Sequence, residues 1–139
     1  MINGQLVREK KSLKVLVVDD QSGMRETLSD ILQEAGYAVD SANDGYVAIK
    51  KAGQQPFDII LMDIIMPGIN GVEAIKEIKK VTSRPEFILM TAYSAETLIN
   101  EAINCGIYRY ITKPFPPDQI IALLEEIRNK KKKSRRNKG

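Results

Sequence analysis

The stretch Asp58-Ile59-Ile60-Leu61-Met62-Asp63 places four consecutive apolar residues between two carboxylates. A run this short, bounded by polar residues, is typical of a β-strand that is buried on both faces. Strands of that kind occur in parallel sheets, because helices cover both sides of such sheets. The stretch therefore predicts a central strand of a parallel sheet, with Asp63 at its carboxyl end.

Four further segments have strand character and lie on either side of this one, at residues 13–18, 37–42, 87–91 and 108–111. Apolar residues at helical spacing follow each of the five strand segments. We expect these helices to begin near Ser22, Asp44, Val72, Ser94 and Pro117, with Ser22 and Ser94 as N-terminal caps. Five alternations of strand and helix predict one doubly wound α/β domain with a five-stranded parallel sheet.

The composition agrees with one globular domain and limits its chemistry. The chain has 139 residues, of which 43% are hydrophobic and 28% are charged. No apolar run approaches the roughly 20 residues that span a bilayer, and the first residues do not resemble a secretory signal. Cys105 is the only cysteine, so we expect no internal disulfide and a cytoplasmic location. The absence of histidine excludes Ser-His-Asp triads and histidine metal sites.

Charge is distributed unevenly along the chain. Residues 128–139 carry eight positive side chains and no acid, whereas the other 127 residues hold 13 basic and 18 acidic side chains. We expect a flexible lead-in at residues 1–12, a domain at residues 13–128 and a basic tail at residues 129–139. A solvated, disordered end is the favoured interpretation of the tail, and nucleic acid binding through it is expected to be weak at most.

Polar residues stand where the predicted strands end. Asp19 and Asp20 follow the first strand, Asp63 ends the third, Thr91 ends the fourth and Lys113 follows the fifth. In an open parallel sheet the carboxyl ends of the strands form the ligand-binding edge. Three carboxylates gathered there repel one another, and a hard cation such as Mg²⁺ would compensate them. The pattern therefore predicts a magnesium site beside a hydroxyl and an ammonium group.

The two remaining groups suit phosphoryl transfer. Mg²⁺, the Lys113 ammonium and the Thr91 hydroxyl can each face one oxygen of a phosphoryl group, where charge must be stabilised. A carboxylate can act as the nucleophile and become an aspartyl phosphate. Asp63 is the best candidate, because it follows a central strand and precedes a loop. Asp63, Thr91 and Lys113 are thus the candidate catalytic residues.

Four segments together resemble the receiver domain of response regulators, from about residue 13 to residue 128. The matching segments are Val17-Val18-Asp19-Asp20, Leu61-Met62-Asp63-Ile64-Ile65-Met66-Pro67-Gly68, Met90-Thr91-Ala92 and Tyr110-Ile111-Thr112-Lys113-Pro114-Phe115. The resemblance implies a flavodoxin-like strand order 2-1-3-4-5. The chain looks like a stand-alone receiver, similar to sporulation phosphorelay intermediates and chemotaxis regulators.

The resemblance also implies roles at the acidic edge. Asp63 would accept a phosphoryl group from a phosphohistidine on a sensor histidine kinase or a histidine phosphotransfer protein. Asp20 would bind Mg²⁺ directly and Asp19 largely through water, and the backbone carbonyl of Ile65 would complete the protein ligands together with Asp63. The domain would assist only its own phosphorylation and dephosphorylation, without acting as an enzyme on other substrates.

A switch is implied in the same way. Thr91 would move toward the phosphoryl group, and Tyr110 would turn inward to fill the space behind it. Lys113 would hold a phosphoryl oxygen, with a cis bond expected between Lys113 and Pro114. A downstream protein target would then meet a changed surface.

Two positions that flank the site in the resemblance are bulky here. Many receivers have polar residues at these positions, which help to place the attacking water, whereas this chain has Ile65 and Tyr93. We therefore predict slow self-dephosphorylation. The alternative is that these two positions vary without consequence.

Three other classes of protein share some of these features. One alternative is that the chain is the receiver fragment of a larger transcription regulator. The basic tail would then be a linker toward a DNA-binding domain. A magnesium-dependent phosphatase is disfavoured, because such enzymes typically have two Asp residues two positions apart at one strand end. In this chain Asp19 and Asp20 are adjacent. An FMN carrier is disfavoured, because the acids after the first strand would repel the FMN phosphate.

Overall fold

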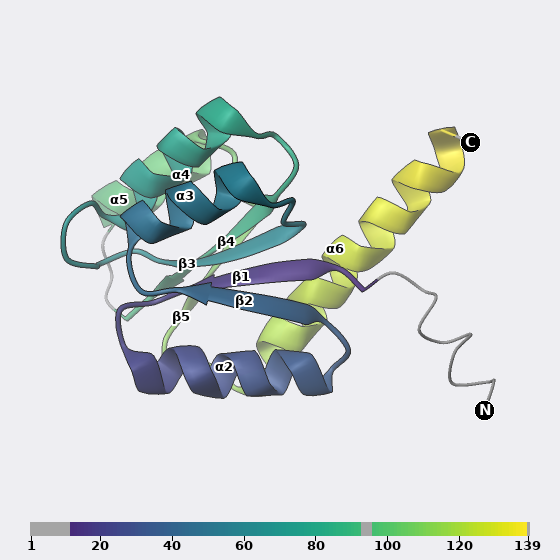
Figure 1. Ribbon diagram of the computed structural model, residues 1–139, viewed down its shortest axis with the longest axis horizontal. Coiled ribbons are helices and arrows are strands. Elements are labelled where there is room, and N and C mark those ends of the chain that lie inside the picture. The colour runs from purple at the N-terminus through teal and green to yellow at the C-terminus, as the bar shows by residue number, and fades with distance from the viewer. Residues whose placement is uncertain (1–11, 93–95, 139) are drawn as a thin grey trace.

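The computed structural model describes residues 12–92 and 96–138, which form a five-stranded sheet covered by helices on both faces (Figure 1). All strands are parallel, and their order is β2-β1-β3-β4-β5. The predicted doubly wound fold and its 2-1-3-4-5 order are therefore confirmed. The strands are β1 (Lys14–Val18), β2 (Ala38–Ala42), β3 (Ile59–Asp63), β4 (Glu86–Thr91) and β5 (Arg109–Thr112). The helices are α2 (Ser22–Glu34), α3 (Gly45–Gln54), α4 (Gly71–Val81), α5 (Glu96–Asn104) and α6 (Pro117–Lys138).

The sheet separates two hydrophobic cores. Helices α3, α4 and α5 cover one face, and α2 and α6 cover the other (Figure 1). Every residue of β3 is buried, and its side chains alternate between the two layers: Ile60 and Met62 pack toward α3 and α4, while Ile59 and Leu61 pack toward α2 and α6. Burial on both faces explains why the strand is continuously apolar, and it holds Asp63 rigidly at the strand end.

Local capping fixes two helix starts beside the acidic edge. The Asp44 side chain accepts a hydrogen bond of 2.9 Å from the backbone N–H of Val47 at the start of α3. Asn70 and Glu73 form a reciprocal capping box at the start of α4. The prediction that Ser22 caps α2 is wrong, because Ser22 is the first helical residue and Gln21 precedes it without a side-chain cap.

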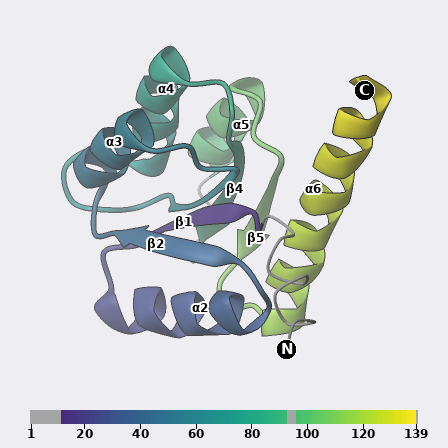
Figure 2. The same ribbon diagram turned by 45° about the vertical axis from the view of Figure 1, so that its right-hand side comes forward.

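The C-terminal residues differ from the expected disordered end. Helix α6 continues without a break through Lys138, so residues 129–138 extend the helix that packs on the sheet. The second half of α6 projects beyond the sheet in both views (Figures 1 and 2). The expected lead-in at residues 1–12 and the expected cap at Ser94 fall almost wholly outside the described residues. Within the described part of the chain, no helix is long and apolar enough to cross a membrane.

Candidate metal and phosphoacceptor site

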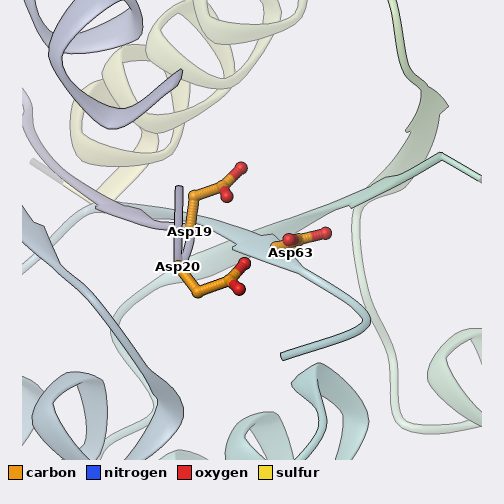
Figure 3. A group of neighbouring side chains, drawn as sticks. All are labelled: Asp19, Asp20 and Asp63. Atoms are coloured by element: carbon orange, nitrogen blue, oxygen red, sulfur yellow. The ribbon is translucent and has the colours of Figure 1, made fainter. Parts of the chain in front are cut away.

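Three carboxylates meet at the carboxyl edge of the sheet, as the strand ends predicted. Asp19 and Asp20 follow β1, and Asp63 is the last residue of β3. One oxygen of each side chain lies within 4.8 Å of the other two (Figure 3). The adjacent parallel strands β1 and β3 bring them together, because Val18 pairs with Met62 in register. An all-oxygen cluster of this kind suits a hard divalent cation.

The cluster includes one cation of the protein itself. The Lys113 Nζ lies 2.8 Å from Asp19 Oδ2 and 3.5 Å from Asp63 Oδ2. The other oxygen of Asp19 accepts a 3.0 Å hydrogen bond from the backbone N–H of Gln21. Fully buried Asp19 is therefore compensated by direct partners, whereas Asp63 has a longer contact with the shared lysine. Sequence reasoning placed Lys113 at this edge but did not predict that it would lie closer to Asp19.

Asp63 has a perturbed acidity that follows from this arrangement. Burial raises the pKa of Asp63 to about 6, and the negative charges of Asp19 and Asp20 act in the same direction. The ammonium of Lys113 opposes these effects and lowers the pKa only in part. One lysine does not offset three carboxylates, so the donor set fits a bound Mg²⁺, which would favour the ionised form of Asp63.

Thr91 and Lys113 lie at the carboxyl ends of β4 and β5, the next two strands of the sheet. Thr91 ends β4 with 1% of its surface exposed, and its carbonyl accepts a 2.7 Å hydrogen bond from the Lys113 backbone N–H. The bond between Lys113 and Pro114 is cis, as predicted. Tyr110 lies on β5 and is 46% exposed, so its ring is at the surface in this structure. The structure thus brings Thr91 and Lys113 to the acidic edge and leaves Tyr110 turned outward.

The loop after β3 is held against the strand end by Gly71. A Cβ atom at Gly71 would lie 2.4 Å from the carbonyl oxygen of Asp63, and the Gly71 backbone N–H donates a 2.8 Å hydrogen bond to the Ile64 carbonyl. No side chain fits between α4 and the end of β3 at this point. This close approach was not predicted from the sequence. The sole sequence signal was a glycine at the first helical position, which is otherwise a poor helix former.

The same loop also packs on the start of α3. A Cβ at Gly45 would lie 2.7 Å from Ile69 Cγ1, and a Cβ at Gly68 would lie 2.8 Å from Tyr46 Cε2. Gly68 has a φ of +85°, which favours glycine. Ile65, the predicted carbonyl ligand, lies in this loop with its side chain 51% exposed. These contacts, which the sequence did not reveal, set where the backbone following Asp63 lies. The other predicted flanking residue, Tyr93, falls outside the described residues.

Comparison with known proteins shows the family to which the chain belongs. Residues 15–125 match the family model of the response regulator receiver domain. The chemotaxis protein CheY from Thermotoga maritima is 39% identical over 115 residues, which are 82% of this chain and 96% of that protein. Regulatory protein AtoC from Escherichia coli is 35% identical over 112 residues, which are 81% of this chain but 24% of AtoC. The structure of the response regulator TrrA from Thermotoga maritima, in complex with Mg²⁺–BeF, has a TM-score of 0.74 and 35% identity over 83% of this chain and 98% of TrrA.

The chain belongs to the response regulator receiver domain family. It is a phosphoacceptor domain of two-component signal transduction. Receiver domains bind Mg²⁺ at an acidic cluster, and this chain has such a cluster in Asp19, Asp20 and Asp63. Receiver domains also interact with kinases or phosphotransfer proteins and with downstream targets.

Proposed function

We propose that Asp63 is the residue that accepts the phosphoryl group, and that Asp19, Asp20, Asp63 and the Ile65 carbonyl hold Mg²⁺. The observation that carries the proposal is the position of Asp63, which ends a fully buried central strand beside two further carboxylates and a lysine. The relative TrrA forms a complex with Mg²⁺–BeF, which supports the proposal that this chain binds Mg²⁺.

The proposed chemistry is a transfer between two side chains. An oxygen of the Asp63 carboxylate attacks phosphorus, forming an O–P bond while the P–N bond to a partner's histidine breaks and returns its electron pair to the imidazole. Bound Mg²⁺ supplies positive charge for the phosphoryl oxygens. Lys113, whose ammonium already lies 3.5 Å from Asp63, then holds one of these oxygens, and the Thr91 hydroxyl donates to another.

The proposed switch uses the buried Thr91 and the exposed Tyr110. Phosphorylation adds charge and acceptor oxygens that attract the Thr91 hydroxyl. Displacement of Thr91 leaves space into which the Tyr110 ring turns from its exposed position on β5. The partner surface on α5, β5 and α6 changes as a result, which is how the signal reaches a downstream protein.

The proposed partners follow from the chemistry of the acceptor. The 139 residues contain no histidine, which agrees with a phosphohistidine donor on a sensor histidine kinase or a histidine phosphotransfer protein. We expect these encounters in the cytoplasm, and we expect no turnover of external phosphate esters. The fluorescence of a model phosphate ester substrate, followed with Mg²⁺ present, tests the second expectation, which repeated turnover would contradict.

One relative favours a second possibility, in which the receiver is part of a longer regulatory protein. The match spans only 24% of AtoC, so a segment similar to this chain is part of a longer regulatory protein there. In that arrangement the partner of the switch surface is another domain of the same polypeptide. Immunoblotting of the source cells distinguishes the two: a band near 15.6 kDa supports the separate receiver, and a larger band alone supports the longer regulator.

The direct test is the intact mass after incubation with acetyl phosphate, with and without Mg²⁺. The proposal predicts a gain of one phosphoryl group that requires Mg²⁺ and disappears in Asp63→Asn. Asp30→Asn is the matched control, because Asp30 is exposed on α2 away from the acidic cluster. A gain that persists in Asp63→Asn, or that needs no divalent cation, contradicts the proposal.

A further inference from the structure

Helix α6 has two halves of different character. Its first half buries four apolar side chains against the sheet: Ile120, Leu123, Leu124 and Ile127. Beyond Ile127 the helix has no apolar residue, and residues 128–139 carry eight positive side chains and no acid. The second half projects away from the domain (Figure 2). We call residues 128–138 the basic extension.

The basic extension is tied to the domain on one side. The Lys130 Nζ lies 2.7 Å from Glu86 Oε2, and the Lys131 Nζ donates a 3.1 Å hydrogen bond to the Arg84 carbonyl. Glu86 begins β4, so these contacts lie at the amino edge of the sheet. Asp63 lies at the opposite, carboxyl edge. A partner on the basic extension and a phosphoryl donor at Asp63 would therefore occupy separate surfaces.

Positive charge around this edge is only partly compensated. A hollow of about 280 Å³ is lined by Asp58, Arg84, Lys131 and Ser134, and a second of about 550 Å³ lies among Glu126, Asn129, Lys130, Lys132 and Lys133. Burial lowers the pKa of Lys131, and the positive charges of Arg84 and Lys130 lower it further. The negative charges of Asp58 and Glu86 oppose this effect. Lys132 and Lys133 are exposed and form no ion pair within the described part of the chain. An added anion would relieve this crowding of cations.

The spacing of charge indicates which anion fits. In residues 128–133, five of the six side chains are cations on a stretch of helix roughly 9 Å long, or about one per 2 Å. Duplex DNA carries one negative charge per ~1.7 Å of axis, and its major groove admits an α-helix. A helix lying in a membrane surface needs an apolar face, which residues 128–138 lack. The other 127 residues, with a net charge of −5, would repel nucleic acid and confine contact to the extension.

We propose that the basic extension is a docking surface for the phosphate backbone of duplex nucleic acid, held through charge without reading sequence. Cations at successive i, i+3 and i, i+4 positions repel one another along the helix, and phosphates on either wall of a groove would neutralise them. Binding should release condensed counterions, so it should weaken steeply with salt.

The test is fluorescence anisotropy of a labelled DNA duplex of about two helical turns, titrated with the full chain between about 50 and 200 mM NaCl. We expect salt-dependent binding that is indifferent to the sequence of the duplex. Lys132→Gln/Lys133→Gln should reduce the slope of log K against log salt by about 2, because each lysine on a phosphate contributes about 1. Lys132→Arg/Lys133→Arg should retain the slope.

The matched control removes the same charge elsewhere. Lys50→Gln/Lys80→Gln changes two exposed lysines on α3 and α4 and should leave the slope unchanged. An equal loss in this control, or no binding near 50 mM salt, overturns the proposal. Binding to phosphatidylserine vesicles without binding to the duplex overturns it in favour of a membrane. Self-association that the Lys132 and Lys133 variant abolishes, again without duplex binding, assigns the extension to the acidic surface of a second copy.

Discussion

At the scale of single residues, the acidic edge depends on how its charges are shared. Lys113 lies closer to Asp19 than to Asp63, so Asp19 is well compensated and Asp63 is less so. The unequal contacts of Lys113 with the two carboxylates suit the proposed mechanism. A phosphoacceptor whose carboxylate is only loosely held by the lysine can exchange that contact for one between Lys113 and a phosphoryl oxygen.

The raised pKa of Asp63 predicts a pH-dependent effect on stability without Mg²⁺. A folded-state pKa of about 6, above the ordinary value of 3.8 for an aspartate, means that ionised Asp63 destabilises the fold. The penalty is absent below about pH 4, grows between pH 4 and 6 and is complete above pH 6. Asp63→Asn should therefore raise the free energy of unfolding at pH 7.5 by up to ~3 kcal/mol, with little gain near pH 4.

Urea denaturation of both forms at the two pH values checks this prediction. Mg²⁺ should shrink the difference at pH 7.5, because it stabilises only the form that retains Asp63. The matched Asp30→Asn change should leave stability within about 0.5 kcal/mol at either pH. A gain for Asp63→Asn that is as large at pH 4 as at pH 7.5 would refute the electrostatic explanation.

Ile65 bears on the lifetime of the phosphorylated form. Its half-exposed apolar side chain stands in the loop after Asp63 and offers no hydrogen bond to an attacking water. We predict slow self-dephosphorylation, and Ile65→Gln should accelerate it roughly tenfold, which corresponds to about 1.4 kcal/mol of barrier. Loss of the phosphorylated mass with time, in the presence of Mg²⁺, measures both rates. A lifetime of seconds for the unmodified chain would contradict the first prediction.

At the scale of elements, strand ends were predictable and loop packing was not. The run Ile59–Met62 identified a strand buried on both faces. Asp63 ends this strand, and Asp19 and Asp20 follow the first strand, so the shared carboxyl edge of a parallel sheet placed the three carboxylates together. The approach of Gly71 to the Asp63 carbonyl depends on how α4 meets β3, which no local pattern encodes. The helical course of residues 129–138 was missed for a related reason. Their repulsive composition disfavours an isolated helix, whereas continuity with packed α6 supports one.

The close approach at Gly71 predicts that adding a methyl group at this position impairs both stability and phosphorylation. Gly71→Ala places a Cβ 2.4 Å from the Asp63 carbonyl oxygen, so the loop or the strand end must shift. We expect a loss of about 1–3 kcal/mol in stability and slower phosphorylation by acetyl phosphate. Thermal denaturation and intact mass measure the two effects.

Gly53→Ala provides the control within a neighbouring helix. Nothing lies within 4 Å of a Cβ at Gly53, which is in α3, so alanine should stabilise the chain by up to ~1 kcal/mol. Phosphorylation should proceed at the unmodified rate. Equal behaviour of the two alanine variants would show that the close approach at Gly71 does not position the site.

At the scale of the whole molecule, the acidic edge with Asp63 and the basic extension lie at opposite ends of the strands. The proposed switch starts at the acidic edge and runs through Thr91 and Tyr110 on the adjacent strands β4 and β5. Thr91 is buried and Tyr110 is half-exposed in this structure, so an inward turn of the ring would change the surface of β5. The signal would thus cross the sheet laterally, without a change of fold.

The switch predicts coupled behaviour that can be followed in solution. In protein labelled with 3-fluorotyrosine, phosphorylation should shift the ¹⁹F resonance of Tyr110, assigned with Tyr110→Phe, as its ring leaves solvent. Thr91→Ala should still gain a phosphoryl group but lose most of that shift. An undiminished shift in Thr91→Ala would disprove the coupling, and Thr91→Ser, which keeps the hydroxyl, should retain it.

The central claim is that Asp63 carries the phosphoryl group, and chemical trapping at the residue tests it most directly. The chain is incubated with acetyl phosphate and Mg²⁺, reduced with borohydride, which converts an acyl phosphate into homoserine, and sequenced by tandem mass spectrometry. The account predicts homoserine at Asp63, and at neither Asp19 nor Asp20, with none formed when Mg²⁺ is withheld. Homoserine at another carboxylate while Asp63 stays unmodified would contradict it.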